Sequence, residues 1–234
     1  MTDAHCHETG GDPNVREFLI GRDFIGVHPW ETLGNNRIIE YSNNRMNEIR
    51  RRLEAESVLG VGEIGLDRLK EREISPRMRE VFEVQLKLAL EFHRPVVLHG
   101  AKCWGQVVET IRNCELRITS ETADGHSPFA IRNSSFLFHG FSRSDGLIPD
   151  IVAIGGYISV GPAVLNGHAV NYRKLVGKIP PDRLLVETDR TDGNAADCPS
   201  VVEVAAEVAK LRGLSIGELE RMTDENAERF LNLI

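Results

Sequence analysis

The sequence predicts an α/β fold, a TIM-like (β/α) barrel in which parallel strands alternate with helices. Three observations favour this class. Short apolar runs alternate with amphipathic segments along most of the chain. The length of 234 residues, with 41% hydrophobic residues, suffices for one large core. Several of the apolar runs also end in His, Asp or Glu. We expect a single domain, residues 1–234. Because the carboxyl ends of parallel strands meet at one face of a barrel, we expect the functional residues to lie on that face.

The first expected strand carries two histidines. Residues 2–7 read T-D-A-H-C-H, and the two-residue period of a strand puts His5 and His7 on the same face. Two neutral imidazoles on that face can share one divalent transition metal. The alternative is that they are frayed N-terminal histidines or a cloning remnant, without a role in metal binding. The next apolar run, Asp23–Val27, ends at His28, a position where a lone histidine is more often structural than a ligand.

The middle of the chain contains two helices and two strands that end in ligand-type residues. The expected elements are a helix over 42–56 with Ser42 as its N-cap, a strand over 57–63, a helix from Ser75-Pro76 to just before Pro95, and a strand over 95–99. The first of these strands ends in Glu63 and the second in His99.

The second half repeats this arrangement. A helix follows His99, and the polar segment 115–133 indicates a loop. A strand over 134–139 ends in His139, a further strand lies within 151–160, and the buried run 183–189, R-L-L-V-E-T-D, ends in Asp189. Helices are expected over 200–212, 215–222 and 224–233, and Ser215 with Glu218 forms a capping box at the start of the second.

Composition narrows the class of protein. The net charge of −7 argues against charge-driven coating of DNA or of an anionic membrane. The sequence contains no run of 18 apolar residues and no signal peptide, so we expect a cytoplasmic protein, a monomer or weak oligomer without a membrane partner. The four cysteines are widely spaced and form no C-x-x-C, which favours free thiols over a disulfide framework or a zinc ribbon.

The strand-terminal residues together predict a metal centre. In a closed barrel, five strands would bring six side chains to one face. They are His5, His7, Glu63, His99, His139 and Asp189. A single catalytic ion needs three protein ligands and an open position, so six ligands suit two ions that share a carboxylate, an arrangement fitted to displacement at phosphorus. Asp189 can also accept the proton of the attacking water.

Motifs spread over nearly the whole chain resemble the TatD-type metal-dependent deoxyribonucleases of the amidohydrolase-like superfamily. They are D-A-H-C-H at 3–7, G-V-H-P at 26–29, G-E-I-G-L-D at 62–67, R-P-V-V-L-H at 94–99, F-H-G-F-S at 138–142, G-G-Y-I-S-V-G at 155–161, R-L-L-V-E-T-D at 183–189 and N-A-E-R-F-L at 226–231. The resemblance implies a TIM-like barrel with one or two divalent ions, magnesium, manganese or zinc. It also implies hydrolysis of DNA phosphodiesters, often as a 3′-to-5′ exonuclease.

The resemblance implies roles for single residues as well. His5, His7, Glu63 and Asp189 would surround one ion, and Glu63, His99 and His139 the other, with Glu63 bridging. Glu63 and Asp189 would be the catalytic carboxylates. His28 matches a family histidine near the substrate.

The chain also departs from the family pattern. Only 8–25 lies between H-x-H and G-V-H-P, so we count seven strands and expect a barrel short of one β/α unit near the N-terminus. Gly100-Ala101-Lys102-Cys103 follows His99 where the family tends to have Ser-Arg-x-Ala, and Arg190-Thr191 follows Asp189 in place of Ala/Ser-Pro. Arg143 stands where a small residue is common.

Four cations would lie at the rim of a closed barrel: Arg68, Lys102, Arg143 and Arg190. Positive charge there suits a phosphate-bearing substrate, although four ordinary surface cations would give the same pattern. Three hypotheses follow. The first is a phosphodiesterase acting on DNA, the second the same centre acting on a small phosphoester, lactone or amide, and the third a degenerate barrel kept as a binding or scaffold protein.

Overall fold

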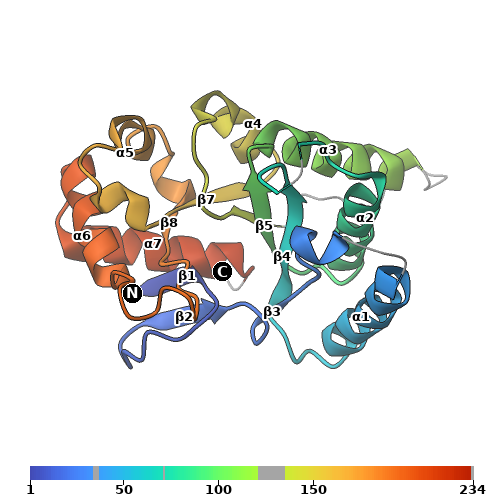
Figure 1. Ribbon diagram of the computed structural model, residues 1–234. Helices are drawn as coiled ribbons and strands as arrows, with labels where there is room; N and C mark the ends of the chain where they lie inside the picture. Colours follow the sequence, from blue (N-terminus) through green and yellow to red (C-terminus); the bar gives the residue numbers. More distant parts are fainter. Residues whose placement is uncertain (34–36, 71, 121–134, 233–234) are drawn as a thin grey trace.

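The computed structural model of the chain describes residues 1–33, 37–70, 72–120 and 135–232, and the strands in these ranges form a parallel barrel (Figure 1). The strands are β1 (Thr2–Cys6), β2 (Arg16–Leu19), β3 (Phe24–Ile25), β4 (Gly60–Asp67), β5 (Val96–Ala101), β6 (Phe136–Phe138), β7 (Gly156–Val160) and β8 (Leu184–Val186). Each pairs in parallel with the next along the chain, within a two-stranded sheet β1–β2 and a six-stranded sheet β3–β8. The TIM-like fold expected from the sequence is therefore confirmed.

Backbone contacts join the two sheets into a ring. On one side the amide of Asp189 donates to the carbonyl of His5 over 3.0 Å, and the amide of His7 donates to the carbonyl of Arg190 over 2.7 Å. On the other side a parallel bridge links Ile20 to Phe24. Because the ring closes between β8 and β1, the carboxyl ends of the first and last strands lie next to each other.

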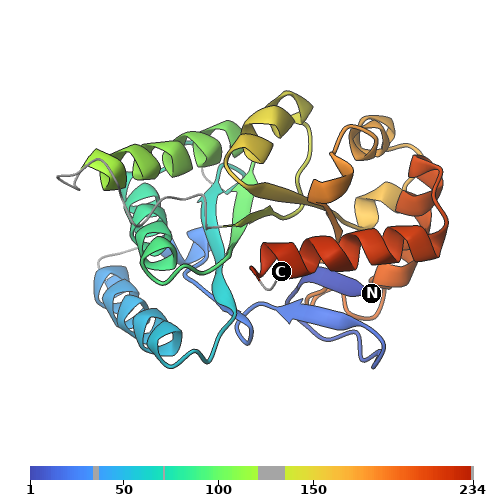
Figure 2. The same cartoon turned by 180° about the vertical axis from the view of Figure 1, so that it is seen from behind.

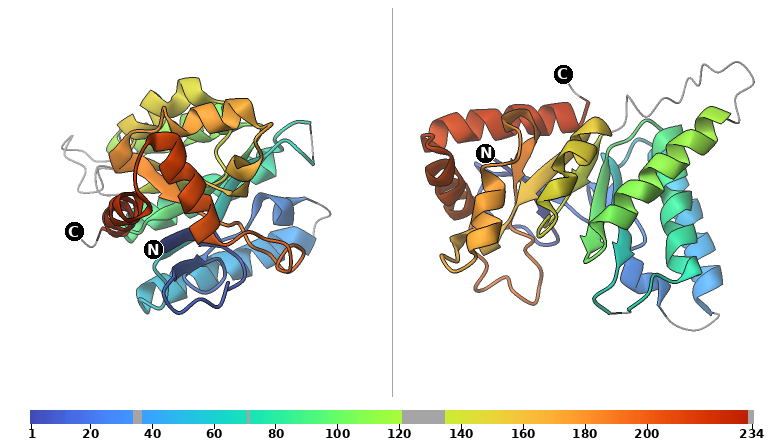
Figure 3. Two further views of the ribbon diagram at one scale, coloured as in Figure 1. Left: turned by 90° about the vertical axis from the view of Figure 1, so that its left-hand side faces the viewer. Right: turned by 90° about the horizontal axis from the view of Figure 1, so that it is seen from above.

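Helices cover the outside of the barrel. They are α1 (Arg37–Glu54), α2 (Pro76–Glu91), α3 (Trp104–Ser120), α4 (Ile148–Ala153), α5 (Val170–Val176), α6 (Val201–Arg212) and α7 (Ile216–Phe230). Helices α1–α3 lie on one side of the strands and α5–α7 on the other (Figures 1 and 3). No helix in these ranges is both long and apolar enough to cross a lipid bilayer.

The last helix holds the barrel from behind. Helix α7 lies next to β1 across the back of the molecule (Figure 2), and Asn226 on this helix donates to the carbonyl of Leu184 at the start of β8 over 2.9 Å. Near the end of α7, Phe230 is fully buried among the aromatic rings of Phe18, Phe24 and Tyr157. This packing fills one end of the barrel and leaves the carboxyl ends of the strands for the polar residues.

The structure corrects the expected strand count near the N-terminus. Strand β2, which the sequence analysis did not identify, makes eight strands in the described ranges instead of seven. What the front of the barrel lacks is crossover helices, because nine residues connect β1 to β2 and four connect β2 to β3. The short segment 8–25 therefore keeps the strand of the missing unit and omits its helices.

Several element boundaries also differ from those expected. Helix α1 begins at Arg37, so Ser42 lies inside it and is not its N-cap. Strand β4 runs on to Asp67, four residues beyond Glu63. Helix α3 extends to Ser120, which corrects the start of the loop expected over 115–133, and residues 121–133 lie outside the described ranges. The helices expected over 215–222 and 224–233 are one continuous helix, α7, whose Ser215–Glu218 capping box is present as expected.

Candidate metal centre

Glu63 lies at the centre of a group of histidines at the carboxyl ends of the strands. Its Oε1 atom is 2.6 Å from Nδ1 of His99 and 2.7 Å from Nε2 of His139. Its Oε2 atom is 3.4 Å from Nε2 of His7 and 3.7 Å from Nε2 of His5. The two carboxylate oxygens thus face two different pairs of imidazoles, which is the geometry of a bridging carboxylate.

Asp189 completes the group on the β1 side. Its Oδ1 atom is 3.5 Å from Nε2 of His5 and 3.8 Å from Nε2 of His7. Among the described residues, three sets of side chains place their ligand atoms within 4.8 Å of one another: His5–His139–Asp189, His5–His7–Glu63 and His28–Glu63–His99. The six side chains predicted from the sequence are therefore brought together, and His28 joins them.

The hydrogen bonds of His28 and His99 distinguish their roles. Nδ1 of His28 accepts from the amide of Trp30 over 3.2 Å, so the ring proton is on Nε2, which lies 3.5 Å from Glu63. His28 is thus arranged as a donor. Nε2 of His99 instead lies 2.9 Å from Asp67, an acceptor that can hold the ring proton there, so Nδ1, 2.6 Å from Glu63, is the nitrogen that a metal ion could take in place of this contact. Asp67 thus orients His99 with its Nδ1 atom toward the centre.

The chemistry of the buried atoms fits a metal ion. His5 is fully buried, and neither of its ring nitrogens has a hydrogen-bond partner in the part of the chain that is described. Leaving a buried polar atom without a partner is costly, and a divalent cation would supply that partner. Burial, the largest influence, lowers the pKa of His5 to about 4, so its imidazole is neutral at pH 7, as a ligand must be.

The central carboxylate is also in its ligand form. Burial alone would raise the pKa of Glu63, but the adjacent imidazoles, above all His139, hold that pKa well below its usual range. Conversely, burial alone would lower the pKa of His139, and the Glu63 carboxylate more than offsets this and raises it. Glu63 is therefore ionised across the neutral pH range, ready to bind a cation.

Three carboxylates behind this group were not identified as site residues from the sequence. Asp67 accepts from His99 and also from the indole nitrogen of Trp30 over 2.7 Å. Asp3 accepts from the hydroxyl of Thr188 over 2.6 Å and from its amide, next to Asp189. Glu187 accepts from the amide of Gly140 over 2.7 Å, next to His139. Each fixes a segment that carries one of the clustered side chains. Each also lies within a motif noted above, but nothing in the spacing reveals its contacts.

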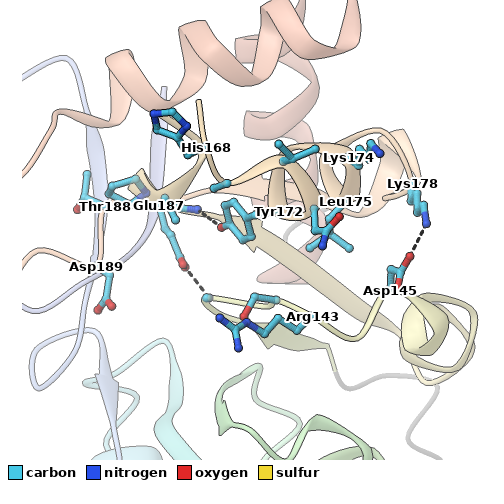
Figure 4. A pocket seen from close by; sticks show the side chains of 18 of the residues that line it. Arg143, Asp145, His168, Tyr172, Lys174, Leu175, Lys178, Glu187, Thr188 and Asp189 are labelled. Atoms are coloured by element: carbon cyan, nitrogen blue, oxygen red, sulfur yellow. Dashed lines mark hydrogen bonds and ion pairs between the residues drawn. The ribbon is translucent and has the colours of Figure 1, made fainter. Parts of the chain in front are cut away.

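Two grooves open on this centre and share the wall formed by Gly140, Ser142, Arg143 and Asp189. The His99 groove, of about 930 Å³, is lined also by Arg68, His99, Lys102, Trp104 and His139. The Tyr172 groove, of about 1170 Å³, is lined also by His168, Tyr172, Lys174, Lys178 and Glu187. Figure 4 shows the Tyr172 groove, with the Lys178–Asp145 ion pair at the side away from Asp189.

Three of the four predicted rim cations line these grooves. Arg68 and Lys102 belong to the His99 groove, and Arg143 belongs to both. Arg190 lines neither of them, because its guanidinium donates to the carbonyls of Ala195 and Cys198 and ties down the loop after Asp189.

Comparisons with known proteins agree with this geometry. The metal-dependent hydrolase YabD of Bacillus subtilis is 26% identical over 216 residues, which cover 89% of this chain and 76% of the relative. The 3′-5′ ssDNA/RNA exonuclease TatD of Erwinia tasmaniensis is 26% identical over 220 residues, with 89% and 77% covered.

A solved structure shows the same fold. The crystal structure of YjjV, a TatD homologue from Escherichia coli K12, superposes with a TM-score of 0.74 at 21% identity and covers 99% of this chain and 97% of its own. The sequence profile described as TatD related DNase matches residues 22–232. Because that match spans most of its length, the chain belongs to the TatD related DNase family and is a metal-dependent hydrolase.

Proposed function

We propose that this chain hydrolyses phosphodiester bonds in single-stranded DNA. The observation that carries the proposal is the Glu63 carboxylate between two pairs of imidazoles, since a bridged pair of ions suits displacement at phosphorus better than a single ion does. The cations of the two grooves support a phosphate-bearing substrate. A relative that is named a 3′-5′ ssDNA/RNA exonuclease supports a single strand as the substrate.

In this proposal the six strand-end side chains divide into two sets. His5, His7, Glu63 and Asp189 would hold one ion, and Glu63, His99 and His139 the other. Bound there, magnesium, manganese or zinc would lower the pKa of a water and offset the charge that develops at the phosphate.

The remaining polar groups have separate tasks. The Asp189 side chain is 48% exposed, so a water in the groove can reach it. Burial alone would raise the pKa of this carboxyl, but the adjacent imidazole of His5, 3.5 Å away, lowers it, which keeps Asp189 ionised and able to accept the proton of the attacking water. His28 would donate a hydrogen bond from Nε2 to a phosphate oxygen. Asp67 would keep Nδ1 of His99 directed at the centre.

The test compares the three hypotheses on one preparation of the metal-loaded protein. We expect a 5′-labelled single-stranded oligonucleotide to be shortened to a ladder of products, and a chelator to stop the reaction because the imidazoles alone supply no activated water. A panel of small phosphoesters, lactones and amides serves for comparison. Turnover of a small ester without any cleavage of DNA would contradict the proposed substrate. Purified protein that holds no metal and turns over none of these compounds would favour the scaffold.

A further inference from the structure

We infer that Lys102 and Arg143 form a phosphate-binding subsite in the His99 groove, which takes the phosphate next to the one that is cleaved. The inference rests on the proposed nuclease function and adds to it the path of the strand. It predicts that the substrate leaves the metal centre along the His99 groove, and not along the larger Tyr172 groove.

The two cations lie close in sequence to strands β5 and β6, which bring His99 and His139 to the centre. Lys102 directly follows β5, three residues after His99, and Arg143 comes four residues after His139. Both side chains are exposed, and both line the His99 groove. Their positions relative to the centre are therefore set by the barrel itself.

The backbone at both positions favours glycine, yet the chain has long cations there. The φ angle is 57° at Lys102 and 60° at Arg143, in the left-handed region that residues with a side chain rarely adopt. In the described ranges, six residues other than glycine have a positive φ, and three of them, Lys102, Arg143 and Asp189, line this one groove. Backbone strain concentrates at functional sites, which indicates that these side chains are kept for what they bind.

Neither cation is paired within the part of the chain that the structure describes. Over the described residues, the Lys102 ammonium and the Arg143 guanidinium have no hydrogen-bond or ion-pair partner, whereas Arg190 is held by two carbonyls and Lys178 by Asp145. An unpaired guanidinium beside a groove is free to bind a phosphate through two parallel N–H donors.

The balance of charge selects the His99 groove over the Tyr172 groove. Arg68, Lys102 and Arg143 line the His99 groove, where Asp189 is the one acidic residue among the described residues of its wall. The Tyr172 groove has Arg143, Lys174 and Lys178, but these are balanced by Asp145, Glu187 and Asp189. On a chain with a net charge of −7, the His99 groove is the better path for a polyanion leaving the centre.

The experiment uses glycine variants, because glycine relieves the left-handed backbone while it removes the cation. Lys102→Gly, Arg143→Gly and the double variant are compared with wild type in their metal-loaded forms. Glu56→Gly is the control, since Glu56 also has a positive φ, of 50°, and its side chain is 82% exposed. Each protein is assayed on a single-stranded DNA oligonucleotide and on bis(4-nitrophenyl) phosphate, a diester that has no neighbouring phosphate.

The readout is the ratio of two values of kcat/KM, that for the oligonucleotide divided by that for the small diester. We expect this ratio to fall about tenfold in each single variant, because each loses one hydrogen bond between a cation and a phosphate. The plot of log kcat/KM for the oligonucleotide against log salt concentration should become shallower by about 0.7 for each contact removed. Glu56→Gly should keep both values of wild type, and the melting temperatures of the groove variants should not fall below that of wild type.

Two results would overturn the inference in different ways. If wild type cleaves the oligonucleotide and the glycine variants keep its ratio and its salt dependence, the subsite is wrong and the nuclease function stands. If wild type cleaves the small diester but no oligonucleotide, the nuclease function itself is wrong, and the subsite falls with it.

Discussion

Glu63→Gln should lower kcat on single-stranded DNA by about a thousandfold or more. In the proposed two-ion centre the variant loses the charge that would hold both cations, and with them several kcal/mol of transition-state stabilisation. Glutamine has nearly the same size as glutamate, so the barrel should still fold. Its amide cannot replace a carboxylate that lies 2.6 Å from His99 and 2.7 Å from His139. The measurement is kcat together with the metal content of the purified protein.

The control for this variant is Glu73→Gln, which removes the same charge from an exposed side chain in the loop after β4. We expect it to keep the activity and the metal content of wild type. A Glu63→Gln protein that retained wild-type kcat would show that the bridging carboxylate has no part in the reaction.

Asp189→Asn should lower kcat by about 10²–10⁴-fold, the usual contribution of a general base, with a much smaller effect on KM. The half-exposed carboxylate lies at the open side of the centre, within 3.5 Å of His5, and an amide there cannot accept a proton from water. The measurement is kcat and KM on the labelled oligonucleotide at saturating metal, so that any weaker binding of the ion is compensated.

Asp192→Asn provides the matched control for the second variant. Asp192 lies three residues further along the same loop and is exposed, so its loss should leave kcat unchanged. If the two variants lost activity to the same extent, the cause would be the charge of the loop as a whole, and Asp189 would not be the base.

The part of the fold that the sequence predicted well is the part that repeats. Buried parallel strands are short, continuous apolar runs. Such runs stand directly before His99 and His139, and the run Leu184–Val186 ends two residues short of Asp189. Since all strands of a parallel barrel end at one face, their order alone predicts that these side chains meet. That inference needs no knowledge of side-chain conformation, which is why six residues spread over 185 positions could be grouped in advance.

Strand β2 illustrates what the sequence could not show. It consists of four residues, R-E-F-L, of which only Phe18 and Leu19 are buried, so it has no apolar run. Its two ends are set by pairing of Arg16 with Thr2 and of Leu19 with Cys6, contacts between segments that a local sequence pattern does not reveal. Prediction from periodicity fails for strands that depend on their neighbours in this way.

The supporting contacts of the site were also beyond the sequence. Asp67 orients His99, and the amide of Trp30 determines which ring nitrogen of His28 carries the proton. Both contacts depend on the directions of side chains in different elements, which the sequence does not give. Arg190 matches the charge expected of a rim cation, and its side chain folds back onto its own loop. Residue type gave the candidates, and only three-dimensional contacts assign their roles.

The most direct test of the metal centre is anomalous X-ray diffraction from crystals of the protein grown with manganese or zinc and measured at the metal edge. We predict anomalous peaks on the two sides of the Glu63 carboxylate, one within bonding distance of His5, His7 and Asp189 and the other within bonding distance of His99 and His139. Full metal in the crystal with peaks only elsewhere, and none at Glu63, would contradict the account.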